Sequence, residues 1–477
     1  MPFAAADLFS PGKHGHQRIA LSWLTGTPRS GKNPRPFCAS LLLAAVCALP
    51  SVTTAVHAAS PPSTATLIAS PEPGWPQFRG PRRDGISDER GLLPAWPADG
   101  PRQLWSAKGA GKGYSSPIIA DGRFFVTGDF SEDVRILAYD LEGKPLWSVT
   151  NGSSWLNQHQ GARSSVTYSA GRIYHQNAHG RVACFEAATG KELWAVELLQ
   201  KFRGENIRWG LSESLLVDER AVYATVGGRD ALLVALDKKT GAVIWQTAPV
   251  FEPEGQGAPE APGYSAPIFV HFAGRRLLIG CSARNLYCVD TATGKIQWLQ
   301  PRPTSYSVLA MSPVLVGDGV FMSAPLGPPG QLYRLKAPSQ PDGPVGVEAA
   351  WTTKLDTAQG GVVHVDGRLF GSFYPRRGGW AALDAATGAV LFEAPDLVKG
   401  AALYADRRLY ALSEDGWMLL LEPTDQEFIV KGRFRLATSP SRDAWAHPVI
   451  LNGRMYLRYH DTVYCYDVRA STAVAQF

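Results

Sequence analysis

The chain has 477 residues, of which 45% are hydrophobic and 19% are charged, so it can bury a large core and is not a disordered protein. Its 48 glycines and 36 prolines exclude a predominantly helical protein, because both residues favour tight turns. The formal net charge is +5, but four of these charges lie in the first 58 residues. The remainder is close to neutral, which predicts that the chain does not bind nucleic acid.

Residues 1–58 are typical of a secretory signal with a long basic first part. The apolar run FCASLLLAAVCAL (37–49) is too short to cross a bilayer, and Val56 and Ala58 suit cleavage before Ala59. A retained anchor helix is the alternative. Val46 does not fit a lipobox ahead of Cys47, so we do not expect a lipoprotein. We expect a periplasmic or secreted protein without a transmembrane segment in the mature chain.

Residues 59–100 predict a linker followed by an extended N-terminal arm. Pro61–Pro73 has the composition of a linker. Trp75–Gly80 and Leu93–Trp96 carry aromatic side chains that a free tail would not need. We therefore expect this segment to pack across the domain that follows it.

From residue 101 onward, a hairpin pattern occurs eight times, as two alternating apolar and polar strings around a turn. The eight hairpins are 115–127, 164–175, 214–225, 266–280, 312–323, 361–372, 402–412 and 447–458. Most are followed by a small residue, an apolar residue, an acid, a turn ending in Gly and an aromatic residue, as at 138–147, 184–194, 235–245, 288–298 and 382–392. Each unit predicts four antiparallel strands. Eight units predict an all-β, eight-bladed β-propeller over residues 101–477, and we expect it to be monomeric.

Three units depart from this pattern. The fifth has an insertion at 337–346, and the seventh lacks the Gly and Trp, so we expect Phe434 to fill its aromatic position. The eighth ends after Asp467 without a fourth strand, while a spare strand, Gln103–Ser106, precedes the first hairpin. We expect this N-terminal strand to complete the last blade, because closing the ring removes exposed strand edges.

The segment VALDKKTGAVIW (234–245) matches the motif Ala-x-Asp-x-x-Thr-Gly-x-x-x-Trp at every fixed position, and 288–298 and 382–392 each depart at one. On these motifs the chain resembles the pyrroloquinoline-quinone (PQQ) type propeller repeat family over about three quarters of its length. The resemblance implies that the Gly turns into the outermost strand and that the aromatic residue packs between blades. The blade-docking residues would be Trp105, Trp147, Trp194, Trp245, Trp298, Trp351 and Phe392. Quinoprotein dehydrogenases, kinase ectodomains and a non-catalytic assembly scaffold share this fold, so the resemblance leaves the function open.

The cysteines favour packing over chemistry. Cys184, Cys288 and Cys465 stand where sister repeats have Ala, which indicates small buried residues. Cys281–Cys288 is the one plausible disulfide. The resemblance implies that a PQQ-dependent alcohol dehydrogenase would carry adjacent cysteines and a Ca²⁺ site, but the sequence has no Cys-Cys pair and no Cys-x-x-Cys-His haem motif. We predict no cofactor, no metal site and no catalytic residues, with PQQ and Ca²⁺ kept for the oxidoreductase alternative.

Aromatic and charged residues gather in the connections that lead into the first strand of each unit. In a propeller these connections surround an axial mouth. The candidate ligand-binding residues are Tyr114, His159, Arg163, Arg208, Trp209, Glu213, Tyr264, Tyr306, Gln359, Lys399, Trp445 and His447. Such a ring suits an anionic, planar or peptide-like ligand. The alternative is a set of polar plugs, in which Arg163 pairs with Glu213 and serines satisfy strand ends.

Three functions follow as hypotheses. The chain resembles the scaffold lipoprotein of the outer-membrane barrel assembly machinery in repeat number and lack of catalytic apparatus, although it lacks a lipobox and carries the arm. This favours a non-catalytic extracytoplasmic binding or scaffold protein for envelope proteins or peptides. The first alternative is a PQQ-dependent oxidoreductase for alcohols or sugars, with PQQ held by Arg163, Arg208 or Lys399 and a metal near Glu213. The second is a carbohydrate-binding propeller that uses Tyr114, Trp209 and Tyr264.

Overall fold

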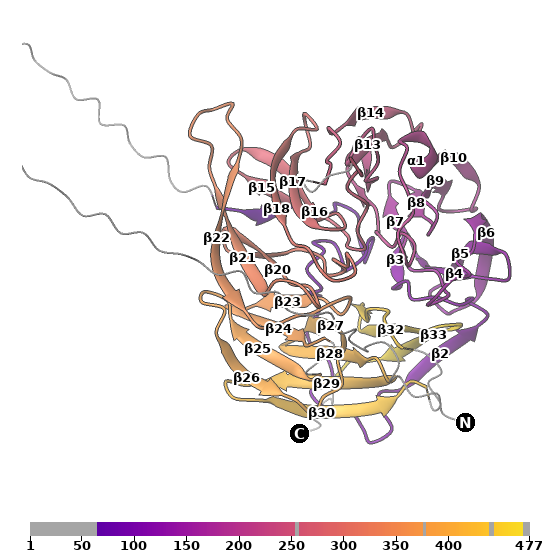
Figure 1. Cartoon of the computed structure of the whole chain (residues 1–477). Helices are drawn as coiled ribbons and strands as arrows, with labels where there is room; N and C mark the ends of the chain where they lie inside the picture. Colours follow the sequence, from indigo (N-terminus) through magenta and orange to yellow (C-terminus); the bar gives the residue numbers. More distant parts are fainter. Residues whose placement is uncertain (1–63, 253–256, 375–377, 438–442, 471–477) are drawn as a thin grey trace, which may run out of the picture. The chain divides into compact units, whose positions relative to one another are not determined.

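The computed structural model describes residues 64–252, 257–374, 378–437 and 443–470. The predicted signal in residues 1–58 lies outside them. All strands of the described residues fall into eight antiparallel sheets, which follow one another around a ring in Figure 1. A single short helix, α1 (Leu198–Lys201), occurs in the described part of the chain. The all-β, eight-bladed propeller predicted from the repeats is confirmed.

Blades 1 to 4 each take four consecutive strands. Blade 1 holds β3 (Ile118–Ala120), β4 (Arg123–Asp129), β5 (Asp133–Asp140) and β6 (Pro145–Ser153). Blade 2 holds β7 (Thr167–Ser169), β8 (Arg172–Gln176), β9 (Arg181–Glu186) and β10 (Glu192–Glu197). Blade 3 holds β11 (Leu216–Val217), β12 (Ala221–Thr225), β13 (Leu233–Asp237) and β14 (Val243–Gln246). Blade 4 holds β15 (Ile268–Phe272), β16 (Arg275–Cys281), β17 (Asn285–Asp290) and β18 (Ile296–Pro301).

Blades 5 to 7 repeat this order, and blade 8 takes its last strand from the other end of the chain. Blade 5 holds β19 (Val314–Val316), β20 (Gly319–Met322), β21 (Gly330–Lys336) and β22 (Gly346–Thr353). Blade 6 holds β23 (Val362–Val365), β24 (Arg368–Ser372), β25 (Trp380–Asp384) and β26 (Val390–Ala394). Blade 7 holds β27 (Gly400–Ala405), β28 (Arg408–Ser413), β29 (Trp417–Pro423) and β30 (Phe428–Arg435). Blade 8 holds β31 (Val449–Leu451), β32 (Arg454–Tyr459), β33 (Thr462–Asp467) and β2 (Gln103–Lys108).

Burial differs between strands of one blade because neighbouring blades cover both faces of the middle strands. In β13 the residues Leu233–Leu236 are all buried, whereas residues alternate between half-buried and exposed along the outermost strand β14. The first strands of successive blades contact one another, as β3 does with β7 and β23 with β27. These first strands therefore surround the axis of the ring.

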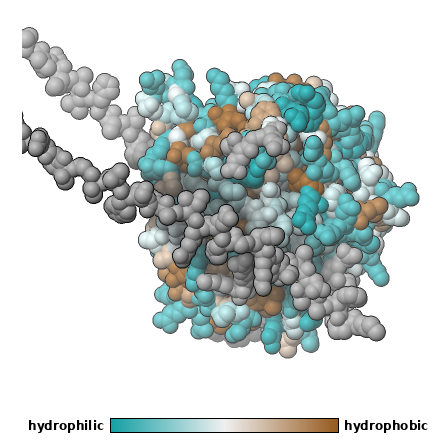
Figure 2. Space-filling view, in the orientation of Figure 1, coloured by the Kyte–Doolittle hydropathy of each residue, from teal (hydrophilic) through white to brown (hydrophobic). Residues whose placement is uncertain are grey.

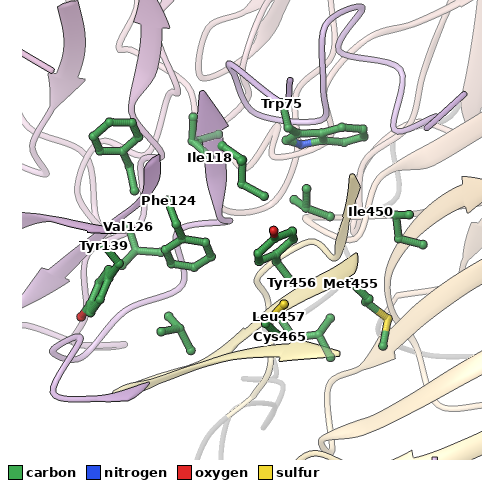
Figure 3. Packing of buried hydrophobic residues seen from close by; sticks show 14 of the residues in the cluster. Trp75, Ile118, Phe124, Val126, Tyr139, Ile450, Met455, Tyr456, Leu457 and Cys465 are labelled. Atoms are coloured by element: carbon green, nitrogen blue, oxygen red, sulfur yellow. The ribbon is translucent and has the colours of Figure 1, made fainter. Parts of the chain in front are cut away.

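The ring closes where the two ends of the propeller sequence meet. Strand β2 pairs antiparallel with β33, and Trp105 lies opposite Cys465. Figure 3 shows the adjoining joint, where Phe124 of blade 1 faces Tyr456 of blade 8; their ring centroids lie 5.8 Å apart. Closure of the last blade by an N-terminal strand is confirmed.

Most joints between blades consist of a Trp on the outermost strand packed against the turn glycine of the next blade. At the joint between blades 2 and 3, a Cβ on Gly241 would lie 2.7 Å from the Trp194 ring, and the Trp194 Nε1–H donates to the Lys238 carbonyl. Gly241 has a φ of +74°, which glycine adopts without strain. Equivalent pairs are Trp105 with Gly143, Trp147 with Gly190, Trp245 with Gly294 and Trp351 with Gly388.

Blade 7 departs from this rule in its register, but Phe434 packs at the joint as predicted. A Cβ on Gly100, which precedes the closing strand β2, would lie 2.7 Å from the Phe434 ring. In regular blades the Trp follows a bulge in the outermost strand, as Trp245 does opposite Ala235. In blade 7 that position, opposite Leu420, holds Gly432, and Phe434 lies two residues further along the strand. The indole of Trp96, from the N-terminal segment, fills the space: a Cβ on Gly432 would lie 2.5 Å from the Trp96 Cβ.

Residues 64–100, which we call the arm, contact all eight blades at the end of the ring where the first strands finish. Part of the arm forms β1 (Thr66–Leu67), which pairs with β15 of blade 4. Figure 3 shows Trp75 above the joint of blades 1 and 8, and the Trp75 backbone pairs with Ile119. The other arm contacts are Pro76 with Tyr168, Arg83 with Ser214, Ala65 with Asp318, Arg79 with Val362, Ile86 with Tyr404 and Ser87 with Ile450.

On the face seen in Figure 2, hydrophobic residues occur as separate patches among hydrophilic ones. Several of the exposed apolar side chains sit on outermost strands next to a docking aromatic residue, including Leu146, Leu193, Ile244 and Leu391. Isolated apolar residues of this kind are common on soluble proteins. No described helix is long and apolar enough to cross a membrane.

Candidate functional site

A pocket of about 260 Å³ opens at the end of the ring where the connections enter the first strands. Its walls come from residues far apart in the sequence, because every blade except blade 7 contributes residues that precede its first strand, and Phe78 of the arm and Tyr374 after β24 add to them. The lining residues are Phe78, Tyr114, His159, Arg163, Trp209, Ser212, Ser214, Tyr264, Ala266, Val308, Ala310, Gln359, Tyr374, Asp443, Trp445 and His447.

Aromatic side chains make up half of the lining residues. Tyr114 and Trp445 lie with ring centroids 4.5 Å apart and planes tilted by 31°, and His159 lies 5.3 Å from Trp445. On the other side, Trp209 lies 6.0 Å from Tyr264 and 6.3 Å from Tyr306. Such rings offer a large rigid apolar surface with polar edges, which suits peptides and other planar groups.

The cationic side chains at the mouth already have partners within the protein. Arg163 donates to the carbonyls of Gln158, His159 and Gly161 and lies over the Trp155 ring. Burial lowers the pKa of Arg163 to about 10, so it remains charged at neutral pH.

Arg208 and Lys399, the two predicted cationic residues that do not line the pocket, also have partners within the protein. Arg208 stacks on Trp209 and Tyr306, with its guanidinium carbon 5.1 Å and 5.4 Å from the two ring centroids. Lys399 forms an ion pair with Glu414, and its Nζ lies 3.8 Å from the Tyr374 centroid.

The arm forms the floor of the pocket. Phe78 meets His447 edge to face, with centroids 4.9 Å apart. The His447 Nε2 contacts the Gln359 carbonyl oxygen at 3.0 Å, which places the ring proton on Nε2. Burial and the charge of Arg79 lower the pKa of His447 to about 3, so this imidazole is neutral. Its Nδ1 has no hydrogen-bond partner among the described residues.

Glu213 lies beneath the mouth, outside the set of lining residues. Its Oε2 accepts a hydrogen bond from the Thr225 backbone, and its Oε1 has no partner among the described residues. Burial raises the pKa of Glu213 to about 7, against the opposing charge of Arg83. The predicted alternative of an Arg163–Glu213 pair is not formed, since Arg163 bonds to loop carbonyls and Glu213 faces the arm.

Serines just before the first strands link neighbouring blades. The backbone N–H of His447 donates to the Ser116 Oγ, that of Ser116 to the Ser165 Oγ, and that of Ser165 to the Ser214 Oγ. The belt joins blades 8, 1, 2 and 3 around the axis. These hydroxyls therefore satisfy backbone groups at strand starts, as the polar-plug alternative proposed for serines.

The pocket holds eight of the twelve predicted mouth residues: Tyr114, His159, Arg163, Trp209, Tyr264, Gln359, Trp445 and His447. Arg208, Tyr306 and Lys399 contact its walls from outside, and Glu213 lies below. Sequence reasoning missed Phe78, whose signal was the aromatic content of the arm, and Tyr374, which follows a second strand instead of preceding a first. Ser212 and Asp443 lie in the predicted connections but were not among the candidate ligand-binding residues, and Ser214, Ala266, Val308 and Ala310 were not predicted.

The described cysteines carry no evident chemistry. Cys184, Cys281, Cys288 and Cys465 are free and buried, so the Cys281–Cys288 disulfide is not formed. Burial raises the pKa of Cys281 to about 12, which keeps it a thiol. Within the described ranges, no group of three His, Cys, Asp or Glu side chains is placed to hold a metal ion.

Comparisons with known proteins agree with this architecture. A BamB from Yersinia pestis is 26% identical over 300 residues, which cover 59% of this chain and 70% of the relative. A 1-butanol dehydrogenase (quinone) from Thauera butanivorans is 28% identical over 227 residues, covering 44% of this chain but only 32% of that relative. A solved quinohemoprotein alcohol dehydrogenase from Comamonas testosteroni superposes with a TM-score of 0.56 at 12% identity, over 83% of this chain and 80% of the other, and shows the fold alone.

A family model described as "Outer membrane protein assembly factor BamB" matches residues 85–229 and 229–339, more than half of the chain. The match begins within the arm and runs into blade 5, so it covers regular blades and the part of the arm from Gly85 onward. The resemblance predicted from the repeat motifs is confirmed. The chain belongs to the BamB family of PQQ-like repeat propellers.

Proposed function

We propose that this chain is a non-catalytic, extracytoplasmic propeller that binds a peptide segment of an envelope protein at its axial mouth. The observation that carries the proposal is the composition of the mouth: its rings are exposed to the pocket, while Arg163, Lys399 and Glu414 are bonded to one another or to the backbone. A wall of this kind binds by shape and stacking without a nucleophile and base in contact. Membership of the BamB family supports the same role.

The location is part of the proposal. The signal predicted in residues 1–58 would export the chain, and the predicted site for cleavage precedes the arm. The described cysteines are free and buried, which is compatible with an oxidising compartment because they have no exposed thiol to cross-link. Envelope proteins are then the partners that the mouth would meet.

The quinoprotein alternative is supported by the dehydrogenase relative but meets a mismatch at the mouth. PQQ is a tricarboxylate and would need free cations with a calcium site beside it. Here Arg163 is the one Arg or Lys among the lining residues of the described pocket, and three of its five N–H groups go to carbonyls, while Lys399 is paired with Glu414. One partly used guanidinium is too little for three carboxylates. Glu213 lies beneath the wall and faces Arg83. The donor set predicted for PQQ therefore does not fit the group in this arrangement.

Photo-crosslinking in the native host tests the binding proposal. A p-benzoylphenylalanine replaces Tyr306, which is 37% exposed at the rim of the mouth, in the full chain. We expect crosslinks to envelope proteins from this position. The matched control carries the same group at Leu391, which is 44% exposed on the outermost strand of blade 6. Equal crosslinking from both positions would contradict the proposal that the partner binds at the mouth.

Reconstitution tests the alternative. The purified chain is mixed with PQQ and Ca²⁺ and assayed for dye reduction with alcohols and aldose sugars. We expect no turnover. Activity that disappears in Arg163→Ala and Glu213→Ala would overturn the non-catalytic proposal.

A further inference from the structure

The pocket is blind because the arm closes the axis behind it. Phe78 forms the floor, and the arm meets the first strands at the opposite end of the ring. Arg79 and Arg83 reach up the axis: Arg83 donates to the carbonyls of Ser214, Leu215 and Pro267, and Arg79 to that of Val362. A polypeptide therefore cannot thread through the ring, and what enters the mouth must end in it.

Positive charge is concentrated around this blind end. Arg79, Arg83 and Arg458 are almost fully buried, and Arg163 lines the wall. None of the four forms an ion pair within 4 Å with a described residue; their hydrogen bonds go to carbonyls and hydroxyls. Burial lowers the pKa of Arg79 to about 10 and of Arg83 to about 9, so both stay charged at neutral pH.

The field of these arginines reaches the pocket walls. The charge of Arg79 helps to lower the pKa of His447, a lining residue, and that of Arg163 acts on Tyr264. One Arg79 nitrogen, Nη1, has no hydrogen-bond partner among the described residues. An unpaired buried guanidinium is costly, and an anion brought near it lowers that cost.

The acidic groups nearby offset only part of this charge. Glu414 is paired with Lys399, and Asp443 lines the pocket. Asp84 acts on Arg79 but is paired with Arg82, and Asp461 acts on Arg458. Burial raises the pKa of Glu213 to about 7, so this group is about half ionised at neutral pH, and that of Asp129 to about 6, so Asp129 is mostly ionised there. The blind end is therefore net positive, and the rim adds Arg208.

Size restricts the occupant further. At about 260 Å³, the pocket is just below the ~300 Å³ at which sites for drug-sized ligands begin. It suits one large residue or a molecule of that size. Walls of stacked rings favour an aromatic side chain, and the charge favours a carboxylate on the same residue.

We propose that the pocket takes the carboxyl-terminal residue of a peptide chain, with its free carboxylate toward the arginines and an aromatic side chain among the wall rings. The inference rests on the proposed function, since it names the part of the partner that the mouth holds. It assigns Arg163 and the arm residue Phe78 to contact with a chain end, and Arg79, which lies behind the lining residue His447, to electrostatic attraction of the carboxylate.

Calorimetry with three short peptides tests this on the full chain. Gly-Gly-Trp has a free carboxylate on its aromatic residue, Gly-Gly-Trp-amide lacks that charge, and Trp-Gly-Gly moves the aromatic residue away from the carboxylate. We expect Gly-Gly-Trp to bind at least about tenfold more tightly than either of the others, because one charge interaction across a shielded pocket is worth roughly that factor. N-acetyltryptophan binding as tightly as Gly-Gly-Trp would assign the site to small aromatic acids instead of chain ends.

Variants separate charge from loop structure. Arg163→Gln should abolish the preference for the free acid, whereas Arg163→Lys should keep most of it. If Arg163→Gln only disturbs the loop, both peptides weaken equally and the preference remains. The exposed Arg334→Gln on blade 5 is the matched control and should change nothing.

The outcomes distinguish this inference from the proposed function. Equal binding of the acid and the amide overturns recognition of the carboxylate and leaves an aromatic-binding mouth. Binding of Trp-Gly-Gly as tight as that of Gly-Gly-Trp overturns the proposal that the aromatic side chain and the carboxylate must belong to the same terminal residue. Failure of every peptide overturns the inference, while crosslinks from position 306 would still support binding of an envelope protein at the mouth.

Discussion

The joint between blades 2 and 3 and the joint at blade 7 solve one packing problem in different ways. At the first, Trp194 comes from the blade itself and rests on Gly241 of the next blade. At the second, the register position holds Gly432, and Trp96 of the arm supplies the indole. The Trp96 ring packs against Phe434 and Tyr410, with centroids 5.5 Å and 5.9 Å away.

This difference ties the arm to the stability of the ring. The joint of blade 7 depends on a segment more than 300 residues away, which supplies both Trp96 and the Gly100 on which Phe434 packs. The same segment also supplies the floor of the pocket through Phe78. Loosening the blade 7 joint should therefore affect the mouth, whereas loosening the joint between blades 2 and 3 should affect mainly those two blades.

The largest effect is expected at the regular joint. Trp194→Ala should lower the free energy of unfolding by about 3–5 kcal/mol, because it empties a buried indole site and removes the bond to Lys238. Urea unfolding of the full chain measures the loss. Leu193→Ala changes the exposed neighbour and should cost under about 0.5 kcal/mol. Equal losses of unfolding free energy in the two variants would contradict a special contribution of the docking position to stability.

Trp96→Ala should cost about 3 kcal/mol, near the low end of the same range because part of the arm can detach. What distinguishes this variant from Trp194→Ala is the place where the structure loosens. Hydrogen exchange should accelerate in the arm and in β30, and Trp194→Ala should leave the arm unchanged. Slow exchange in the arm of Trp96→Ala would mean that Arg79 and Arg83 hold it without the indole.

Moving the indole back into the repeat sharpens the comparison. Gly432→Trp alone should destabilise the fold, because its side chain would collide with Trp96. Combined with Trp96→Ala, it should recover about 1–2 kcal/mol of the loss by restoring the regular arrangement. A double variant that is no better than Trp96→Ala contradicts the equivalence of the two indoles.

The last effect depends on pH and concerns Glu213, on which the charge of Arg83 from the arm acts. Burial raises the pKa of Glu213 from 4.5 to about 7, so the folded state holds a proton that the unfolded state releases between these values. The stability of the wild type relative to Glu213→Gln should therefore fall as the pH rises from about 4.5 to above 7, by roughly 1–3 kcal/mol. Denaturant unfolding of both proteins at each pH measures this difference, with exposed Glu348→Gln as the control.

The comparison of the two proteins isolates Glu213 because the other shifted groups are common to both. His175 and His447 have pKa values lowered to about 3 by burial, and Asp129 has one raised to about 6. A difference that stays constant over this range of pH would contradict the assignment of a buried, readily protonated carboxyl to position 213.

The blade count and the closure of the ring were predictable from the sequence because both depend on patterns that repeat locally. Alternation within the hairpins defines each strand, and the Gly and Trp of 234–245 define a joint. The connections that lead into the first strands could also be located from the sequence. Their positions correctly predicted that Tyr114, Trp209 and His447 lie at one mouth. The eighth unit lacks a fourth strand and the strand that contains Trp105 has no blade of its own, so the sequence predicted that the two would pair.

Only the tertiary structure decided what the arm does. Nothing in the local pattern pairs Trp96 with Gly432 or sets Phe78 under His447, since each pair joins residues more than 300 positions apart without a shared period. Burial of a side chain likewise depends on neighbours from several blades. The pKa values of Glu213 and Arg79, which burial shifts, could therefore not be predicted from the sequence. The sequence determined the ring by repetition, and long-range packing determined the blind, charged pocket at its axis.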